Sequence, residues 1–259
     1  MEYVFAADPA LMFVIFVAFG LVTFAVSVGF LRFLGRNGMP NQAAMPVPNF
    51  AASITTAWAL ALGFAAADIW TVNARAQASA SEERSAIARV AGVAATQALN
   101  RPDLIASLVA YKSTVETEEW GRFLNTEPAP AVDAAIEAIR VILVDMSISG
   151  LPGPLISKIT DDFDQLQDAR SARLAIGGTP FSQYKWYLVL ILTVLSQVAL
   201  ASVHADRPRG GRTALAIFTV AASICLWILA LHANPYVGVA RIEFEDIRGF
   251  TFEGIAGAG

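Results

Sequence analysis

The chain has 259 residues, of which 56% are hydrophobic and only 15% are charged, and its mean hydropathy is +0.54. A soluble domain usually carries about 25% charged residues, so this composition, together with long apolar runs, predicts a membrane protein. The formal net charge of −4 argues against a nucleic-acid partner. The one cysteine, Cys225, lies in an apolar run and leaves no intrachain disulfide to form.

Four apolar runs are long enough to cross a bilayer as helices, which takes about 20 residues each. We expect these spans at residues 9–34, 50–72, 184–203 and 213–231. The residues before the first run include Glu2 and Asp8 but no Lys or Arg. A signal peptide has a positively charged start, so the first run is predicted to be a retained span.

The second span continues without a helix breaker into a polar, amphipathic segment, and one long helix is predicted from about Phe50 to Leu99. Three further amphipathic helices follow, at about 102–123, 131–148 and 155–176, separated by proline-rich or glycine-rich turns. Their apolar residues recur at helical spacing. We expect buried positions at Leu104, Leu108, Tyr111, Val115, Val132, Ile136, Ile139, Leu143, Met146, Ile156, Ile159, Phe163, Leu166 and Leu174.

The predicted fold is therefore all-α: four transmembrane helices form two hairpins, and a helical extramembrane domain is inserted between spans two and three. The expected parts are a first hairpin at 1–74, the helical domain at 75–182, a second hairpin at 183–235 and a partly disordered tail at 236–259. Four spans place both termini and the helical domain on the same side of the membrane.

The short loops on the other side carry a group of arginines. They are Arg32, Arg36, Arg207, Arg209 and Arg212. By the positive-inside rule these loops are cytoplasmic, so the termini and the helical domain are predicted to face outward.

Several segments resemble the bestrophin-like domain family of bacterial membrane proteins, long described as a domain of unknown function. They are GFAAADIWTVNARAQASASEE from the second span onward, LVAYKSTVETEEW, RSARLAIGGTPFSQYKWYLVLILTVL and LHANPYVGVARI. Their order and spacing follow the family over nearly the whole chain. The resemblance implies an oligomeric channel for anions such as chloride in a bacterial inner (plasma) membrane, with span two lining the pore. It also implies a cytoplasmic helical domain, opposite to the arginine count.

A pore-lining face is predicted on span two from residues three or four positions apart. It consists of Ser53, Thr56, Leu60, Phe64 and Asp68. Hydroxyl groups at one end, apolar side chains midway and a carboxylate at the other end are compatible with a filter and a hydrophobic gate. The competing interpretation is helix packing through small residues, with Ser and Thr bonded to backbone carbonyls.

Two acidic segments require a choice between a functional and a structural interpretation. Asp161, Asp162 and Asp164 are candidate calcium ligands, but the run lacks the glycine and the distal glutamate of an EF-hand, and a solvated helix face is the favoured interpretation. Glu82 and Glu83 are likewise expected on an exposed helix face.

No phosphate-binding loop, zinc spacing or nucleophile elbow is present, so neither an enzyme nor a cofactor is predicted. Two hypotheses remain. One is a homo-oligomeric channel that contacts lipid and small inorganic ions. The other is a non-catalytic accessory or sensor subunit that binds partner proteins through its helical domain.

Overall fold

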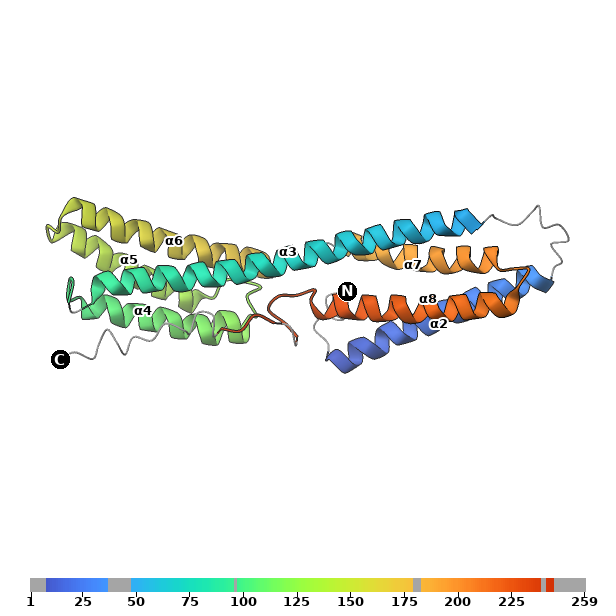
Figure 1. Cartoon of the computed structure of the whole chain (residues 1–259). Helices are drawn as coiled ribbons and strands as arrows, with labels where there is room; N and C mark the ends of the chain where they lie inside the picture. The colour runs from blue at the N-terminus through green and yellow to red at the C-terminus, as the bar shows by residue number, and fades with distance from the viewer. Residues whose placement is uncertain (1–7, 37–47, 96, 179–182, 239–240, 245–259) are drawn as a thin grey trace. The chain divides into compact units, whose positions relative to one another are not determined.

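The computed structural model describes residues 8–36, 48–95, 97–178, 183–238 and 241–244. These residues contain helices and turns but no strand, which confirms the all-α class (Figure 1). The helices are α2 (Pro9–Arg36), α3 (Pro48–Ala94), α4 (Pro102–Thr114), the π-helix η2 (Val115–Arg122), α5 (Pro130–Ile148), α6 (Gly153–Gly178), α7 (Gln183–Val203) and α8 (Pro208–Leu231).

Four of these helices, α2, α3, α7 and α8, are long and apolar enough to span a membrane, as predicted. Helix α8 begins at Pro208, five residues before the predicted start. A proline is favoured in the first turn because its fixed φ suits a helix and its missing N–H would have no intrahelical partner there. Pro102 and Pro130 occupy the same position in α4 and α5.

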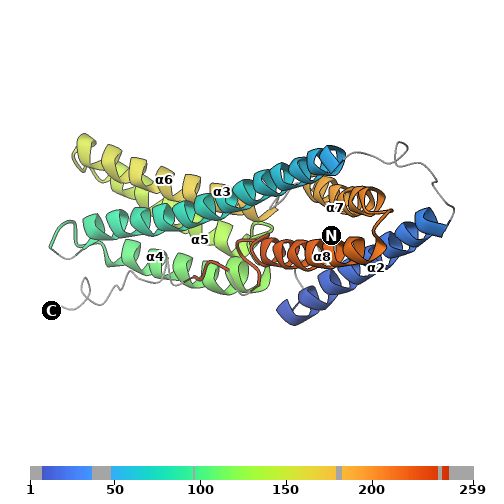
Figure 2. The ribbon, with the colours of Figure 1, turned by 45° about the vertical axis from the view of Figure 1, so that its right-hand side comes forward.

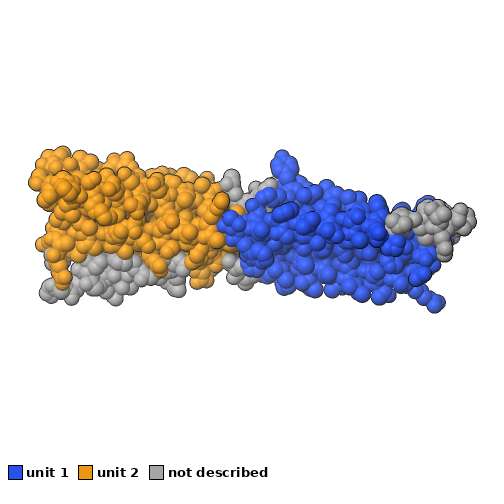
Figure 3. Space-filling model, turned by 45° about the horizontal axis from the view of Figure 1, so that its top comes forward, with its two compact units in different colours: residues 1–71, 181–234, 238–240 blue, residues 72–180, 235–237, 241–259 orange. Residues whose placement is uncertain are grey.

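The chain divides into two compact units (Figure 3). Unit 1 contains residues 1–71, 181–234 and 238–240, and unit 2 contains residues 72–180, 235–237 and 241–259. The long helix α3 contributes its first half to unit 1 and its second half to unit 2. Of the predicted tail, residues 239–240 and 245–259 lie outside the described residues.

Unit 1 is built on three closely packed helices, α2, α7 and α8, whereas α3 approaches them less closely (Figure 2). Met12, Trp186 and Leu226 are buried between them. Gly20 allows α2 to meet α8, because a Cβ there would lie 2.2 Å from Ser223 Oγ. A Cβ at Gly29 of the same helix would meet no atom within 4 Å.

A neutral polar cluster joins the same three helices. The Gln197 side chain of α7 donates from Nε2 to Thr23 Oγ1 at 3.1 Å and to Thr219 Oγ1 at 3.2 Å. Its Oε1 accepts from Ser27 Oγ at 3.3 Å. All four side chains are buried. In an apolar surrounding a buried amide must be hydrogen-bonded, and Gln197 achieves this with hydroxyl groups from α2 and α8.

Unit 2 has its own apolar core, formed by the second half of α3 together with α4, α5, α6 and η2. The periodicity identified this core well. Of the predicted positions, all those on α4, η2 and α5 are buried, as are Ile159, Phe163 and Leu166 on α6. Ile156 is partly buried against the core. Leu174 is only half-buried, because the inward face of α6 carries Arg173 at this level.

Candidate functional site

Four of the predicted pore-lining residues lie on one face of α3 that the other described residues leave uncovered. Ser53 and Thr56 are exposed, as are Leu60 at 58% and Phe64 at 73%. The opposite face of α3 packs against the other helices of unit 1. There Trp58 donates from Nε1 to Thr193 Oγ1 at 2.9 Å.

This uncovered face is unusual for a membrane span because most of its side chains are small or carry hydroxyl groups. Between Ala52 and Thr71 the exposed positions are mainly Ala, Gly, Ser and Thr. By contrast, the exposed face of α2 carries Leu11, Phe13, Leu21 and Val22 among others. Only 17% of the apolar window of α3 is buried, compared with 33–39% for the other three spans. Small residues are typical of surfaces that meet another helix or a polar pathway.

Asp68 lies at the edge of this face and is half-buried. Its Oδ2 is 2.6 Å from Nζ of Lys185 at the start of α7. The ion pair within unit 1 balances the charge of the carboxylate. A position beside Asp68 is therefore less repulsive to an anion than an unpaired carboxylate would make it.

The candidate calcium ligands are not brought together. Asp162 is 1% exposed and its Oδ1 accepts hydrogen bonds from Arg89 Nε at 2.8 Å and Lys158 Nζ at 2.6 Å. Asp161 and Asp164 are exposed. Among the described residues, no group of three His, Cys, Asp or Glu side chains is placed to hold a metal ion. The expectation of a wholly solvated acidic face was wrong for Asp162, because two cations from α3 and α6 meet its carboxylate.

Unit 2 contains a buried set of charges that the sequence analysis missed. We call it the Arg173 cluster. Arg173 Nε lies 2.7 Å from Glu83 Oε2, and its Nη2 lies 2.9 Å from Glu119 Oε2. Arg170 pairs with the same Glu119. All members are buried: Glu83, Tyr111, Glu119, Asn125, Arg170 and Arg173.

Further hydrogen bonds join the Arg173 cluster to other elements, whereas the Nδ2 atom of Asn125 is buried without a hydrogen-bond partner among the described residues. Tyr111 donates its hydroxyl to Glu83 Oε1 at 2.7 Å, and Arg173 donates to Asn125 Oδ1. The backbone N–H of Ala129 donates to Glu119 Oε1 at 3.2 Å. Two buried carboxylates and two guanidinium groups thus lie in one hydrogen-bonded network that connects α3, α4, η2 and α6. The exposed Asp133 of α5 joins it through Arg170, whose Nη2 lies 2.8 Å from Asp133 Oδ1.

Burial and charge shift the titration of this network. Burial raises the pKa of the Tyr111 hydroxyl well above 10, and the adjacent Glu83 carboxylate adds to the rise. Burial alone would lower the pKa of Arg173, but the Glu83 carboxylate reverses this and raises it. Tyr236, whose hydroxyl donates to the Arg173 carbonyl at 3.4 Å, has its pKa raised to about 12, chiefly by burial.

A tight turn after η2 positions Asn125 for this network. Leu124 and Asn125 have φ of 50° and 58°, in the left-handed region that side chains rarely adopt. The turn packs directly on α6 at Gly177, where a Cβ would lie 1.8 Å from the Asn125 carbonyl oxygen. Glycine is therefore required at 177 by the close approach of two backbones.

The sequence did contain a signal for the Arg173 cluster. Glu83 follows Ala76 and Ala80 at helical spacing and precedes Ile87 and Val90, all on the buried face of α3. The expectation that Glu83 is exposed was wrong for this reason. Arg173 similarly follows Phe163 and Leu166 on α6. Charged residues in register with an apolar face are candidates for buried pairing.

The four long apolar helices are those of a multi-pass helical membrane protein. The family model of the bestrophin-like domain matches residues 14–247. The chain therefore belongs to the bestrophin-like domain family, as the resemblance predicted.

Solved structures share the fold at low sequence identity. One is a mutated bacterial bestrophin homolog from Klebsiella pneumoniae, with a TM-score of 0.65, 10% identity and coverage of 89% of this chain and 95% of that chain. Another, described as a membrane protein, has a TM-score of 0.68, 11% identity and coverage of 92% and 94%. A search of curated proteins found no match.

Proposed function

We propose that this chain is the subunit of a homo-oligomeric ion channel in a bacterial inner membrane, with the face of α3 defined by Ser53, Thr56, Leu60 and Phe64 lining a shared pathway. The uncovered face of α3 is the observation that carries the proposal. Membership of the bestrophin-like family and the shared fold of a bacterial bestrophin homolog support it. A closed ring of identical subunits would bury such a face around one axis.

The chemistry of this face fits ion passage. The Thr56 hydroxyl offers a polar contact, whereas the Ser53 hydroxyl donates to the Asn49 carbonyl of its own helix at 2.9 Å and can only accept. The exposed side chains of Leu60 and Phe64 supply an apolar constriction that gates by excluding water. Since Lys185 balances Asp68, we favour a small inorganic anion such as chloride as the permeant ion.

The experiment that tests this proposal combines stoichiometry with flux. Native mass spectrometry of the detergent-purified protein is expected to show a single homo-oligomer, and liposomes that contain it are expected to release an anion. Phe64→Ala widens the constriction and is expected to raise the flux. Phe33→Ala is the matched control, because Phe33 is a similarly exposed aromatic residue on α2.

Two outcomes would overturn the channel proposal. A monomer would remove the shared pathway. Equal flux in wild type, Phe64→Ala and Phe33→Ala would show that α3 does not control passage. A change in anion-to-cation selectivity on Asp68→Asn would further locate Asp68 beside the pathway.

The second candidate function is a non-catalytic accessory or sensor subunit. One observation favours it: helix α5 exposes an apolar stripe on unit 2, with Val141 at 60%, Val144 at 54% and Ile148 at 80% exposure. Such a stripe is typical of a surface that meets a partner. A fixed complex with other chains in the mass spectrum, without flux, would favour this function.

We further propose that unit 2 and both termini face outward, on the strength of Arg207 before α8 and of Arg209 and Arg212 in its first turns. A reporter fused after Gly259 that is active only outside the cytoplasm tests this orientation. Activity supports it, and replacement of the three arginines by alanine is expected to lower that activity. An inactive reporter in the wild type would favour the family-like orientation instead.

A further inference from the structure

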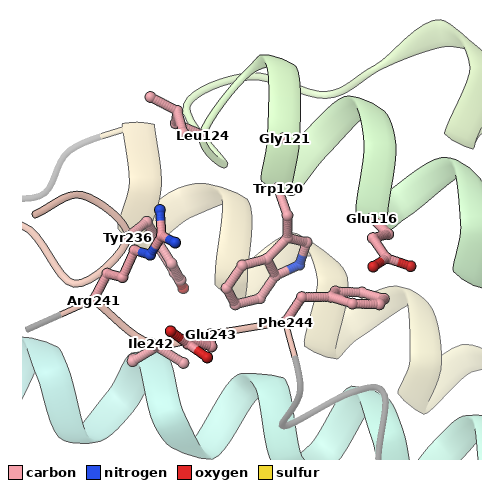
Figure 4. Close-up of a pocket in the computed structure, with 9 residues that line it drawn as sticks. All are labelled: Glu116, Trp120, Gly121, Leu124, Tyr236, Arg241, Ile242, Glu243 and Phe244. Carbon is pink, nitrogen blue, oxygen red and sulfur yellow. The ribbon is translucent and has the colours of Figure 1, made fainter. Parts of the chain in front are cut away.

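A pocket of about 330 Å³ lies within unit 2, between η2 and the segment that follows α8 (Figure 4). Its volume is at the small end of ligand-binding pockets in proteins. Aromatic rings and charged groups line it together. The side chains that matter are Trp120, Tyr236, Phe244, Glu116, Arg241 and Glu243.

The aromatic side of the pocket is organised around Trp120. The ring centroid of Trp120 lies 5.3 Å from that of Tyr236 and 5.9 Å from that of Phe244, both in edge-to-face arrangements. The Arg173 guanidinium carbon lies 5.6 Å from the centroid of the same indole. Trp120 therefore already accepts one cation from the protein, and its neighbours add further electron-rich faces.

The backbone that presents Trp120 is itself unusual. Trp120 lies in the π-helix η2, a conformation that is rare in proteins and frequent at functional sites. Gly121 fits this wider turn, because a Cβ there would lie 3.2 Å from the Glu116 carbonyl oxygen. In the described part of the chain the indole N–H is buried and has no hydrogen-bond partner.

Opposite charges flank this aromatic centre. In the view of Figure 4, Arg241 lies on one side of the Trp120 indole and Glu116 on the other. Arg241 and Glu243 are exposed, and neither forms an ion pair with another residue that the structure describes. The pocket thus offers a guanidinium for an anionic group and carboxylates with aromatic faces for a cationic group.

We propose that this pocket binds a small zwitterion that carries an ammonium and a carboxylate, such as a free amino acid or a betaine. Arg241 receives the carboxylate, and Glu243, two residues along the same segment, receives the ammonium together with the aromatic rings. The proposal concerns unit 2 alone and does not depend on whether α3 lines a pathway.

The test is isothermal titration calorimetry of the full-length protein in detergent. The probes are L-leucine and glycine betaine, each with both charges. Two analogues remove one charge each: L-leucine methyl ester lacks the carboxylate and 4-methylpentanoate lacks the ammonium. We expect saturable binding of at least one zwitterion. Each leucine analogue is expected to bind about 10- to 100-fold more weakly than leucine, since a charge-assisted hydrogen bond is lost.

Two variants locate the site. Arg241→Met is expected to weaken binding of the zwitterion by about 10- to 100-fold and to leave binding of the methyl ester unchanged. Glu243→Gln is expected to weaken the binding of the zwitterion and of the ester alike. Arg122→Met is the matched control, because Arg122 is an exposed arginine of η2 that stacks on Phe123 outside the pocket. Circular dichroism verifies that each variant keeps its helices.

Three outcomes would overturn the proposal. The first is the absence of saturable binding for every probe at millimolar concentrations. The second is binding that Arg241→Met and Glu243→Gln leave unchanged, and the third is an equal loss of binding in Arg122→Met. None of these results bears on ion flux, so the fate of this site and of the proposed channel can be told apart.

Discussion

The two units join their helices with different chemistry. In unit 1 a neutral amide, Gln197, connects α2, α7 and α8 through three hydroxyl groups. In unit 2 two arginines and two glutamates connect α3, η2 and α6. Both sets are buried and hydrogen-bonded. The difference is therefore one of charge and not of burial.

This difference follows from the cost of burying a charged group in each unit. A charge within a lipid bilayer is costly even when partly compensated, so the spans are joined by groups that remain neutral. In unit 2, which we propose to be extramembrane, a charged pair can form if both partners enter the core together. Its weakness is that removal of one partner leaves the other charged and buried. We expect unit 2 to be more sensitive to single substitutions at its polar core than unit 1.

The largest effect is expected for Arg173→Met, which leaves Glu83 and Glu119 facing one another without their shared cation. A loss of about 3–5 kcal/mol of stability is expected, measured as faster hydrogen exchange of α6 amides. Arg140→Met is the matched control, because Arg140 is half-exposed and pairs at the surface with Glu137. Addition of Glu83→Gln should recover part of the loss. No recovery would mean that packing, and not charge, holds the cluster.

The second effect tests the turn that places Asn125 in the network. Gly177→Ala puts a Cβ into the Asn125 carbonyl, and a loss of about 1–3 kcal/mol is expected from the forced shift. Gly153→Ala, in the same helix, meets no atom within 4 Å and should leave the protein as stable or slightly more so. Thermal melts of the two variants distinguish these outcomes, and hydrogen exchange of α6 amides shows whether the loss of stability lies in this helix. Equal melting temperatures would contradict the close approach.

The third effect belongs to unit 1. Gln197→Leu removes three side-chain hydrogen bonds, but Thr23 and Thr219 keep bonds to carbonyls of their own helices. We therefore expect a loss of only about 1–2 kcal/mol in detergent unfolding. Ser202→Ala serves as the control, since its hydroxyl donates to the Val198 carbonyl of its own helix. A loss as large as that of Arg173→Met would break the comparison between the units.

The smallest effect concerns Asp162 and pH. Burial opposes its ionisation, but hydrogen bonds from Lys158 and Arg89 lower its pKa below 3.8. A carboxyl whose folded pKa is depressed stabilises the fold above the unfolded pKa, and this stability is lost as the pH falls through the folded pKa. Asp162→Asn should therefore cost about 1 kcal/mol at pH 7, and the difference from wild type should shrink below about pH 4.

The control for this pH experiment is Asp161→Asn, because Asp161 is the exposed neighbour of Asp162. Thermal melts of both variants and of the wild type across the acid range give the result. A pH-independent cost in Asp162→Asn would show that the ion pairs do not stabilise unit 2.

The apolar pattern predicted the spans and much of the unit 2 core, since burial of residues such as Leu104 and Leu108 leaves a regular signature at helical spacing. The same pattern failed at Glu83 and Arg173, because charged side chains were assigned to water by their chemistry alone. Pairing depends on contacts between positions 90 residues apart, and spacing along one helix contains no information about them.

The candidate sites show the same limit. Helical geometry alone places Ser53, Thr56, Leu60 and Phe64 on one face. The ion pair of Asp68 with Lys185 joins two spans, and the sequence does not show which residues of two spans meet. The pocket at Trp120 was not anticipated either. The segment VETEEWGR has no composition that distinguishes a π-helix from an α-helix, since the two differ only in which carbonyl each N–H meets.

The π-helix also constrains the number of residues between Tyr111 and Asn125. Glu119 and Trp120 are neighbours with different tasks: the carboxylate enters the Arg173 cluster and the indole lines the pocket. A single residue removed between Tyr111 and Glu119 would rotate the two side chains by one position and bring the indole to the two arginines. The stretch from Tyr111 to Asn125 should therefore tolerate many substitutions on its outer face but no insertion or deletion.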